Sequence, residues 1–491
     1  MMEMVLISVY AILLGFILMY SFVQLSMLIS YWKKRNSIEV PEITEGFPLV
    51  TIQLPIYNEK YVIERLINKV CELDYPKDKM QIQVLDDSTD NTLAIVKSIV
   101  ESKQKEGFNI QQVLRTDRSG FKAGALKYGM GVSDGDFVAI FDADFMPQSD
   151  FLKQVIPHFY DGAVGMVQTR WGHLNKDFSL LTRLQAFGLD AHFSVEQVGR
   201  NNAGHFINFN GTAGVWRKEC IENAGSWESD TLTEDLDLSY RAQVKGWKFK
   251  YLQEVETPAE LPVNIYPLKS QQFRWTKGAA ECFRKNLSRV WRSDLPFLTK
   301  LHAFFHLSNS FLFVAILLSA LVSVPLLYIK INTDEYDLFY KLGSIFLISF
   351  IVLVMVYYTS FKYTNEGDRK FGLYFPLFLS VSMGLSLHNS IAVVEGFFGK
   401  KTPFVRTPKF NSVGKSVQKE SLNQYVKSAI SPLIFVEFVL AIYFSVAVIY
   451  GALNYEFGLL PFHLMLSFGF FFVSVSAIKY HLLEGNVFSK D

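Results

Sequence analysis

A long uncharged segment at the N-terminus restricts most strongly what this chain can fold into. Met4 to Trp32 contains no charged residue, and a helix that crosses a bilayer needs about 20 predominantly apolar residues. The apolar core of a cleavable signal peptide is shorter, about 7–15 residues, and basic residues precede it. Here Lys33, Lys34 and Arg35 follow the segment. We therefore expect residues 1–32 to form a retained membrane anchor whose C-terminal end is cytoplasmic.

Further apolar segments return in the second half of the chain. They are Leu307–Leu327, Leu342–Tyr358, Tyr374–Phe397, Pro432–Leu453 and Leu459–Ile478. The links after the first and before the last of these segments are acidic, whereas residues 400–427 are basic, so the former are expected outside and the latter inside. These assignments agree only if the polar segment 374–397 is interfacial or re-entrant. An ordinary polar span is the alternative there. The pattern predicts five spans, one before the polar region and four after it.

Composition fits a chain that is partly soluble and partly embedded in membrane. Half of the 491 residues are hydrophobic, 19% are charged and the mean hydropathy is +0.18. Lys and Arg number 48 against 47 Asp and Glu, so the basic excess typical of nucleic-acid binding is absent and we expect no nucleic-acid partner. The three cysteines, Cys71, Cys220 and Cys282, have no regular spacing, which excludes a disulfide framework or a zinc site.

Residues 49–290 form the predicted soluble domain, after a linker at 33–48 and before a membrane domain at 291–491. Apolar runs predict five strands: Val50–Ile56, Ile82–Leu85, Ile110–Leu114, Phe137–Phe141 and Val164–Thr169. Helical spacing predicts helices between them, over 61–73, 93–100 and 125–130. Strands that alternate with helices indicate a mostly parallel sheet covered on both faces, with ligands at the carboxyl ends of the strands.

Two acidic motifs follow predicted strands and therefore lie at that edge. In Asp142-Ala143-Asp144 the two carboxylates face the same side of an extended chain and suit Mg²⁺ or Mn²⁺. A solvated turn is the alternative for this motif. Asp86 and Asp87 end another strand and are candidates for contact with a nucleotide or its metal. A helix N-cap, with Ser88 or Asp90 opening the next helix, is the alternative for this motif, and both interpretations can hold if the cap is Asp90.

Three more groups of polar residues have the chemistry of a transfer site. Thr233-Glu234-Asp235 begins an amphipathic helix, where Asp235 is either a helix-capping carboxylate or a general base. Lys122 can neutralise phosphate or be an exposed helix lysine. In Gln271-Gln272-Phe273-Arg274-Trp275, Arg274 can donate to a diphosphate and Trp275 can stack on a sugar. A juxtamembrane aromatic–basic belt is the alternative, but the next span begins some thirty residues later.

The order of these motifs resembles the membrane synthases of glycosyltransferase family 2, especially cellulose-synthase-like mannan and glucomannan synthases. The resemblance covers nearly the whole chain. The strings that carry it are QVLDDSTD at 83–90, FKAGAL at 121–126, FDADF at 141–145, FNGTAGVW at 209–216, TEDLD at 233–237, KGWKFKY at 245–251 and QQFRW at 271–275. It implies a GT-A domain, an α/β nucleotide-sugar-binding fold with a Rossmann-like mixed sheet, beside an α-helical transmembrane domain.

The resemblance also implies roles for individual residues. Asp235 would be the catalytic base, and Asp142 and Asp144 would bind the divalent cation. The residues implied for nucleotide-sugar binding are Asp86, Asp87, Lys122, Asp142, Gln271, Arg274 and Trp275. Those implied for the acceptor are Asn210, Gly211, Thr212, Glu234 and Trp275.

One further segment, 400–410, is similar to the gating loop of cellulose synthases. The resemblance rests on Phe404, Arg406, Thr407 and Lys409, with Arg406 where cellulose synthases have valine. A loop with these donors on the inside of the cell can contact a diphosphate and exclude water on closing. The alternative is that the positive charges of this segment only keep it on the cytoplasmic side of the membrane.

We therefore expect a hexosyltransferase of the inner cell membrane with a cytoplasmic catalytic domain. It would invert the donor, UDP-glucose or GDP-mannose, and extend a β-linked polysaccharide, processively and with export through its own helices. Its expected partners are the donor, the glycan acceptor, the lipid bilayer and export proteins of the cell envelope. Two alternatives remain open: a lipid glycosyltransferase similar to ceramide glucosyltransferase, and an inactive subunit that binds glycan or nucleotide.

Overall fold

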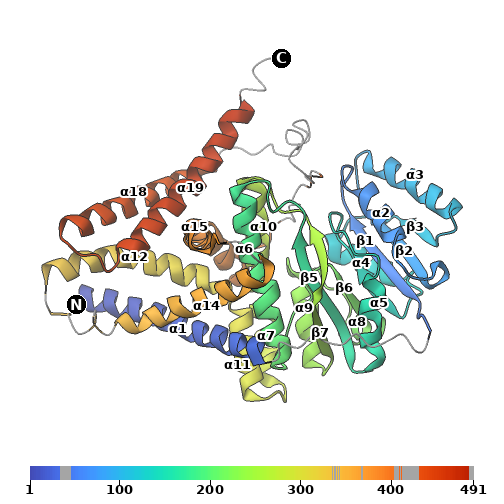
Figure 1. Ribbon diagram of the computed structural model, residues 1–491, viewed down its shortest axis with the longest axis horizontal. Coiled ribbons are helices and arrows are strands. Elements are labelled where there is room, and N and C mark those ends of the chain that lie inside the picture. Colours follow the sequence, from blue (N-terminus) through green and yellow to red (C-terminus); the bar gives the residue numbers. More distant parts are fainter. Residues whose placement is uncertain are drawn as a thin grey trace.

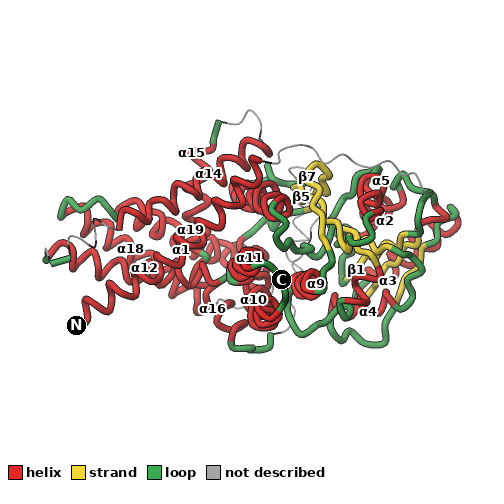
Figure 2. The backbone as a smooth tube through the Cα atoms, turned by 90° about the horizontal axis from the view of Figure 1, so that it is seen from below, coloured by secondary structure: helices red, strands yellow, loops and turns green. Residues whose placement is uncertain are grey.

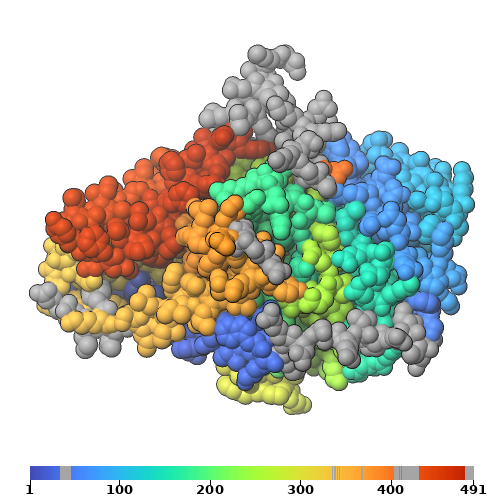
Figure 3. All heavy atoms as spheres, viewed as in Figure 1, coloured from blue at the N-terminus to red at the C-terminus, as the bar shows by residue number. Residues whose placement is uncertain are grey.

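The computed structural model describes residues 1–33, 46–333, 335–336, 339, 341, 343–365, 369–402, 409, 411 and 431–485. An α/β domain forms one end of the molecule and long helices form the other (Figure 1). A view turned by 90° shows the same division, with the strands confined to one end (Figure 2). Helices that are far apart in sequence lie together in the helical part, where the first helix packs among those after residue 300 (Figure 3).

The α/β domain is built on one mixed sheet of seven strands. In spatial order the strands are β3 (Ile110–Val113), β2 (Met80–Asp86), β1 (Val50–Ile56), β4 (Phe137–Ile140), β6 (Gly214–Arg217), β5 (Val164–His173) and β7 (Lys248–Ala259). The first four are mutually parallel, and β6 is antiparallel to both of its neighbours. All five predicted strands are present. The sequence patterns did not predict β6 and β7.

Helices cover both faces of the sheet, as expected from the alternating pattern. One apolar core joins β1 and β2 to α2 (Ile63–Cys71), α3 (Thr92–Lys105) and α5 (Phe151–Val155). The opposite core contains α4 (Phe121–Met130), α8 (Lys218–Asn223) and α9 (Glu234–Val244). Short 3₁₀ turns occupy Lys77–Lys79 and Ile156–Tyr160. Burying these faces removes apolar side chains from water and fixes where the strand ends lie.

Four helical elements connect this domain to the long helices. They are α6 (Leu180–Ala191), a single π-helical turn η3 (His192–Glu196), α7 (Gln197–Asn202) and α10 (Ile265–Arg292). Helix α11 (Phe297–Leu307) follows α10 and packs on it. The predicted apolar segment from Leu307 starts as a helix only at Phe311, because a turn at 308–310 separates α11 from the next helix.

Among the described residues, five helices are long and apolar enough to cross a membrane, and a bent pair, Phe371–Gly384 and Ser386–Phe397, would make six if it formed one span. The five are α1 (Met2–Lys33), α12 (Phe311–Asn332), α14 with its preceding turn η4 (Ser344–Thr364), α18 (Pro432–Leu453) and α19 (Leu460–Gly485). The N-terminus and the connections α12–α14 and α18–α19 lie together at the end opposite the sheet (Figure 1). There Tyr336 donates to Glu3 and Lys330 pairs with Glu456.

Helices α15 (Phe371–Gly384) and α16 (Ser386–Phe397) form a pair bent by 49°. Tyr374, near the start of the pair, accepts a hydrogen bond from Arg183 of α6 at 2.6 Å. Glu395, near its end, accepts one from Lys277 of α10 at 3.1 Å. Both ends of the bent pair therefore contact elements that belong to the α/β side of the molecule.

Candidate active site

A cavity opens where the carboxyl ends of the parallel strands meet α9 and α10. The structure brings together residues that are widely separated in sequence. Twelve of the predicted site residues line the cavity: Asp87, Lys122, Asp142, Asp144, Asn210, Gly211, Glu234, Asp235, Gln271, Arg274, Trp275 and Lys409. Two described residues of the predicted set, Asp86 and Thr212, do not line it.

Asp142 follows β4 and is held by groups from two other segments. Its carboxylate accepts from Lys122 Nζ at 2.5 Å, and its backbone N–H donates to Thr212 Oγ1 at 2.9 Å. The same Lys122 donates to the carbonyl of Gly211 at 2.9 Å. Thr212 is fully buried, so it orients Asp142 from behind and does not face the cavity. The Asp142 carboxylate raises the pKa of Lys122 despite the opposing effect of burial.

Asp144 is almost fully buried and is paired with a lysine from a distant part of the chain. Its Oδ2 accepts from the Glu260 backbone N–H at 3.1 Å and from Lys409 Nζ at 2.6 Å. Each aspartate of the pair therefore has an ammonium group beside it. Two adjacent carboxylates offer the hard oxygen ligands that Mg²⁺ and Mn²⁺ prefer, so the donor set fits a divalent cation.

The two aspartates at the end of β2 differ in what they contact. Asp87 lines the cavity, where Arg115 donates to both its oxygens, from Nε at 2.8 Å and from a terminal nitrogen at 2.5 Å. Asp86 is buried and accepts from Ser88 N at 2.9 Å and Gln112 Nε2 at 2.8 Å. The sequence suggested both as candidates for contact with a nucleotide or its metal. Only Asp87 lines the cavity, because the two oxygens of Asp86 accept from the turn that follows β2 and from the neighbouring strand β3.

Glu234 and Asp235 are the first two residues of α9, and both line the cavity. Burial, together with the neighbouring Glu234 charge, raises the pKa of Asp235 to about 7. Burial also raises the pKa of Glu234, against the opposing charge of Lys122. Gly211 has φ +82°, and a Cβ there would lie 3.1 Å from Asp235 Oδ2, so glycine both allows this turn and leaves the carboxylate accessible.

Helix α10 contributes Gln271, Arg274 and Trp275 from one turn and the next. Burial lowers the pKa of Arg274, although Glu234, Asp142 and Asp235 act in the opposite direction. The Trp275 ring lies 6.4 Å from the ring of Trp171, a residue of β5. The carboxylates and the guanidinium groups of Arg118 and Arg274 thus share the cavity with two indoles.

The structure adds cavity residues that the sequence patterns did not identify. Arg118 stacks on the Tyr57 ring at 3.3 Å, and Trp171 and His173 lie at the end of β5. Arg115 does not line the cavity but pairs with Asp87, which does. Both arginines lie within four residues of the end of the predicted strand 110–114, and that position was the available sequence signal. Trp171 and His173 lay in the part of β5 that extends past the predicted strand.

The segment 400–410 is described only in part. Phe404, Arg406 and Thr407 lie outside the described residues. Lys409 is described and contacts Asp144, and Asn411 accepts from Arg65 at 2.5 Å. Both contacts join this segment to the α/β domain.

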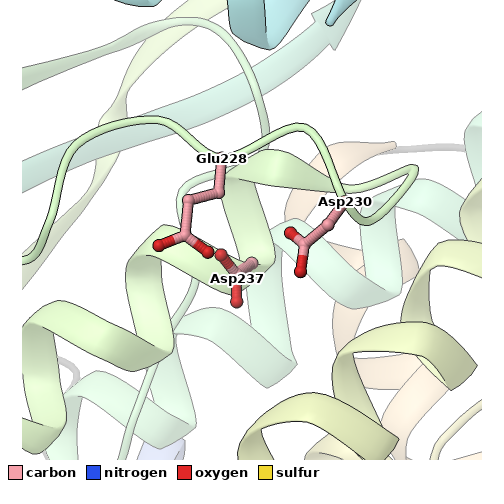
Figure 4. Close-up of side chains that lie close together, drawn as sticks. All are labelled: Glu228, Asp230 and Asp237. Atoms are coloured by element: carbon pink, nitrogen blue, oxygen red, sulfur yellow. The ribbon is translucent and has the colours of Figure 1, made fainter.

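A second acidic group, Glu228, Asp230 and Asp237, lies outside this cavity. Figure 4 shows the three carboxyl groups turned toward one another, Asp237 from α9 and the others from the loop before it. Lys285 Nζ donates to all three, at 2.6, 2.6 and 3.0 Å. The Lys285 ammonium group lies at the centre of these carboxylates, so they form a partly exposed salt-bridge cluster apart from the cavity.

Comparison with known proteins assigns the chain to a family. Residues 48–278 match the family model described as glycosyltransferase like family 2. The chain is 37% identical over 394 residues to glucomannan 4-beta-mannosyltransferase 1 of Oryza sativa subsp. japonica, covering 76% of this chain and 72% of that one. This chain belongs to glycosyltransferase family 2. Its named relatives in that family are of the cellulose-synthase-like type, which confirms the resemblance of the sequence motifs.

Two further comparisons define how far the likeness extends. Probable glucomannan 4-beta-mannosyltransferase 4 of the same plant is 41% identical over 334 residues, which cover 63% of this chain and 60% of that one. The solved structure of mannosyltransferase PcManGT from Pyrobaculum calidifontis, in complex with GDP-Man and Mn²⁺, has a TM-score of 0.56 at 19% identity. It covers 82% of this chain and 100% of that chain, and it confirms the predicted GT-A fold.

Proposed function

We propose that this protein transfers a hexose, with inversion, from a nucleotide-sugar to the end of a β-linked polysaccharide. The observation that carries the proposal is the place of Asp235. A carboxylate whose pKa is raised to about 7 shares one cavity with Asp142, Asp144 and Arg274. That combination puts a base suited to neutral pH beside groups that bind a diphosphate.

The donor would bind on the side of the strand ends. Asp87, held by Arg115, would contact the nucleoside, and Lys122 and Arg274 would donate to the diphosphate. Asp142 and Asp144 would hold a divalent cation, which neutralises charge on the leaving group when it is bound. Their lysine partners are both flexible side chains that can turn toward phosphate oxygens. A protein with the same fold was solved with GDP-Man and Mn²⁺, which supports this arrangement.

The acceptor would lie between Asp235 and the indole of Trp275. Asp235 would take the proton from an acceptor hydroxyl as its oxygen attacks the anomeric carbon. The new glycosidic bond forms as the bond from that carbon to the diphosphate breaks, and Arg274 stabilises the departing nucleoside diphosphate. One displacement converts an α-linked donor into a β-linked product without a covalent enzyme intermediate.

The relatives favour mannose as the transferred sugar. They are named glucomannan 4-beta-mannosyltransferases, so GDP-mannose is the donor we propose first and UDP-glucose is second. The same names support a polymer product. The proposal also includes export of the polymer through the membrane helices and partner proteins in the cell envelope.

The decisive assay offers detergent-purified protein each donor separately, with Mn²⁺ or Mg²⁺, and sizes the product after digestion with linkage-specific hydrolases. A long β-linked product that disappears with EDTA and returns with added cation is the expected result. A product that carries a single sugar on a lipid would show that the protein is a lipid glycosyltransferase and not a polysaccharide synthase. Absence of transfer from both donors, with nucleotide still bound, would favour an inactive subunit.

The base is tested by Asp235→Asn, which keeps the shape of the side chain and removes its basicity. We expect transfer to fall by about 10²–10⁴-fold, with binding of the nucleotide product retained because Asp87 and Arg274 are unchanged. Asp78→Asn, an exposed carboxylate in the turn before β2, is the matched control and should transfer normally. Turnover of Asp235→Asn close to that of this control would eliminate Asp235 as the base.

A further inference from the structure

The amide oxygen of Asn210 has hydrogen-bond partners, whereas its amide nitrogen has none among the described residues. Its Oδ1 accepts from Asn208 Nδ2 at 2.9 Å and from Gln197 Nε2 at 3.4 Å, and His192 Nε2 lies 3.4 Å from it. Its Nδ2 is buried and has no hydrogen-bond partner among the described residues. Asn208 Nδ2 and Gln197 Nε2 also donate to the backbone carbonyls of Phe209 and Asn208, so both are donors and they determine the orientation of the Asn210 amide. Asn210, its neighbour Gly211 and Asp235 all line the cavity, and a Cβ at Gly211 would lie 3.1 Å from Asp235 Oδ2.

An unsatisfied buried N–H group at a substrate cavity is expected to donate to the substrate. The base must contact the acceptor hydroxyl, so a donor beside Gly211 lies on the acceptor side. The natural partner of the Asn210 amide is therefore a hydroxyl or ring oxygen of the acceptor sugar.

A chain of hydrogen bonds runs from Asn210 to the first membrane helix. His192 Nδ1 lies 3.0 Å from Glu196 Oε2, and Gln24 Nε2 of α1 donates to Glu196 Oε1 at 2.5 Å. Gln24 also donates to Tyr20 OH at 3.1 Å, and Tyr20 donates to Asn309 at 3.0 Å. The network thus connects the cavity wall to α1 and to the turn between α11 and α12.

Local backbone geometry supports a specific role for this chain. His192 and Glu196 are the first and last residues of the π-helical turn η3, and such turns occur frequently at functional sites. Burial would raise the pKa of Glu196, but its hydrogen bond and charge interaction with His192 outweigh burial and lower it. Glu196 is therefore an ionised acceptor, which strengthens both of its hydrogen bonds.

Helix α1 is held tightly against this turn. A Cβ at Gly199, in α7, would lie 2.4 Å from the backbone oxygen of Met27. The buried face of α1 includes Tyr20, Gln24 and Met27, so close backbone packing and the polar chain occur on the same side of the helix. A polar glutamine on an apolar helix is costly unless it has a fixed partner.

We propose that Gln24 and the His192–Glu196 pair are positioning residues for the acceptor: they fix the Asn210 amide so that its N–H group donates to the acceptor sugar. This inference rests on the proposed transferase function. It assigns to the first membrane helix a part in substrate positioning, in addition to anchoring. None of the three residues lines the cavity.

The test compares Gln24→Leu, Glu196→Gln and the exchanged pair Gln24→Glu/Glu196→Gln in full-length protein. The exchanged pair keeps a hydrogen bond between positions 24 and 196. Each variant is assayed with GDP-mannose and a β-1,4-linked manno-oligosaccharide as acceptor, and thermal unfolding in detergent is recorded. Ser21→Ala is the matched control, because Ser21 is buried on α1 but donates only to the backbone of Ile17.

The positioning role predicts that Gln24→Leu lowers kcat/KM for the acceptor by about tenfold, because small displacements of a positioning group are costly. The KM for GDP-mannose should stay within about twofold, since ground-state donor binding is not changed. The exchanged pair should recover most of the lost rate. Glu196→Gln retains the shape of the side chain, so it reports on the network even if Gln24→Leu unfolds.

Three results would overturn the inference. They are acceptor kinetics of Gln24→Leu and Glu196→Gln equal to those of Ser21→Ala, a parallel rise in the KM for GDP-mannose, and no recovery in the exchanged pair. Failure of the proposed function itself is distinguishable, because the wild-type protein would then transfer no sugar from either donor.

Discussion

At the scale of single residues, the site is defined by how each carboxylate is held. Asp142 and Asp144 each have a lysine partner and Asp87 has Arg115, whereas Asp235 forms no ion pair with a described residue. Asp235 instead accepts from the Leu236 backbone N–H at 2.8 Å. Burial and the Glu234 charge raise the pKa of Asp235 to about 7.

The raised pKa of Asp235 predicts how activity depends on pH. A base acts when it is deprotonated, so kcat/KM should rise with pH through about 7 and level off above it. Glu234→Gln removes the like charge that contributes to the shift, so the midpoint should move to lower pH. Burial, the larger cause, remains, so the midpoint should stay above the usual aspartate range.

The measurement is a pH–rate profile of the wild type, Glu234→Gln and Asp78→Asn. The last should keep the wild-type midpoint. A wild-type profile without an ascending limb, or a midpoint of Glu234→Gln above that of the wild type, would contradict the assignment of this pKa to the base.

At the scale of elements, α10 connects the site to the membrane helices. It presents Arg274 and Trp275 to the cavity, and Lys277 to Glu395 of α16. One turn before the cavity residues, Lys269 donates to both oxygens of Glu437 of α18, at 2.6 and 2.7 Å. Both side chains are at least nine-tenths buried. This pair holds the α10 backbone against α18 where the cavity begins.

The buried pair predicts a marked asymmetry between single and double substitutions. Lys269→Met leaves the Glu437 carboxylate buried without its partner, which should destabilise the protein by about 3–5 kcal/mol. Lys269→Met/Glu437→Leu removes both charges and should restore most of the lost stability. Thermal unfolding in detergent measures both. Equal loss in the single and double variants would mean that packing, and not charge pairing, determines this contact.

At the scale of the whole molecule, one end of the helical part contacts the α/β domain and the opposite end lies away from it. The N-terminus and the connections after α12 and α18 lie at the end away from the sheet (Figure 1). Both ends of the bent α15–α16 pair contact the α/β side. If the five long apolar helices cross the membrane and the bent pair does not, this arrangement favours a topology in which the catalytic domain and the bent pair share one side of the membrane.

This topology predicts which positions react with an impermeant thiol reagent in intact cells. In a Cys71→Ser background, which removes the one cysteine that is not buried, Tyr455→Cys in the exposed α18–α19 connection should be labelled. Asp78→Cys, on the surface of the α/β domain, should react only after permeabilisation. Labelling of Asp78→Cys in intact cells would reverse the orientation. Protection of Tyr455→Cys would place its connection inside.

The sequence alone determined the family, the five strands, the order of the acidic motifs and the apolar helices. Those features are encoded locally: periodicity reports which face of an element is buried, and strand order places Asp142 and Asp87 at one edge. The tertiary structure decided what no local pattern contains. It assigned Asp86 to a turn, paired Asp144 with Lys409 across 265 positions, and placed Gln24 beside Glu196 across 172. Such contacts depend on how whole elements pack, because side chains distant in sequence meet only when burial of apolar faces fixes the elements that carry them.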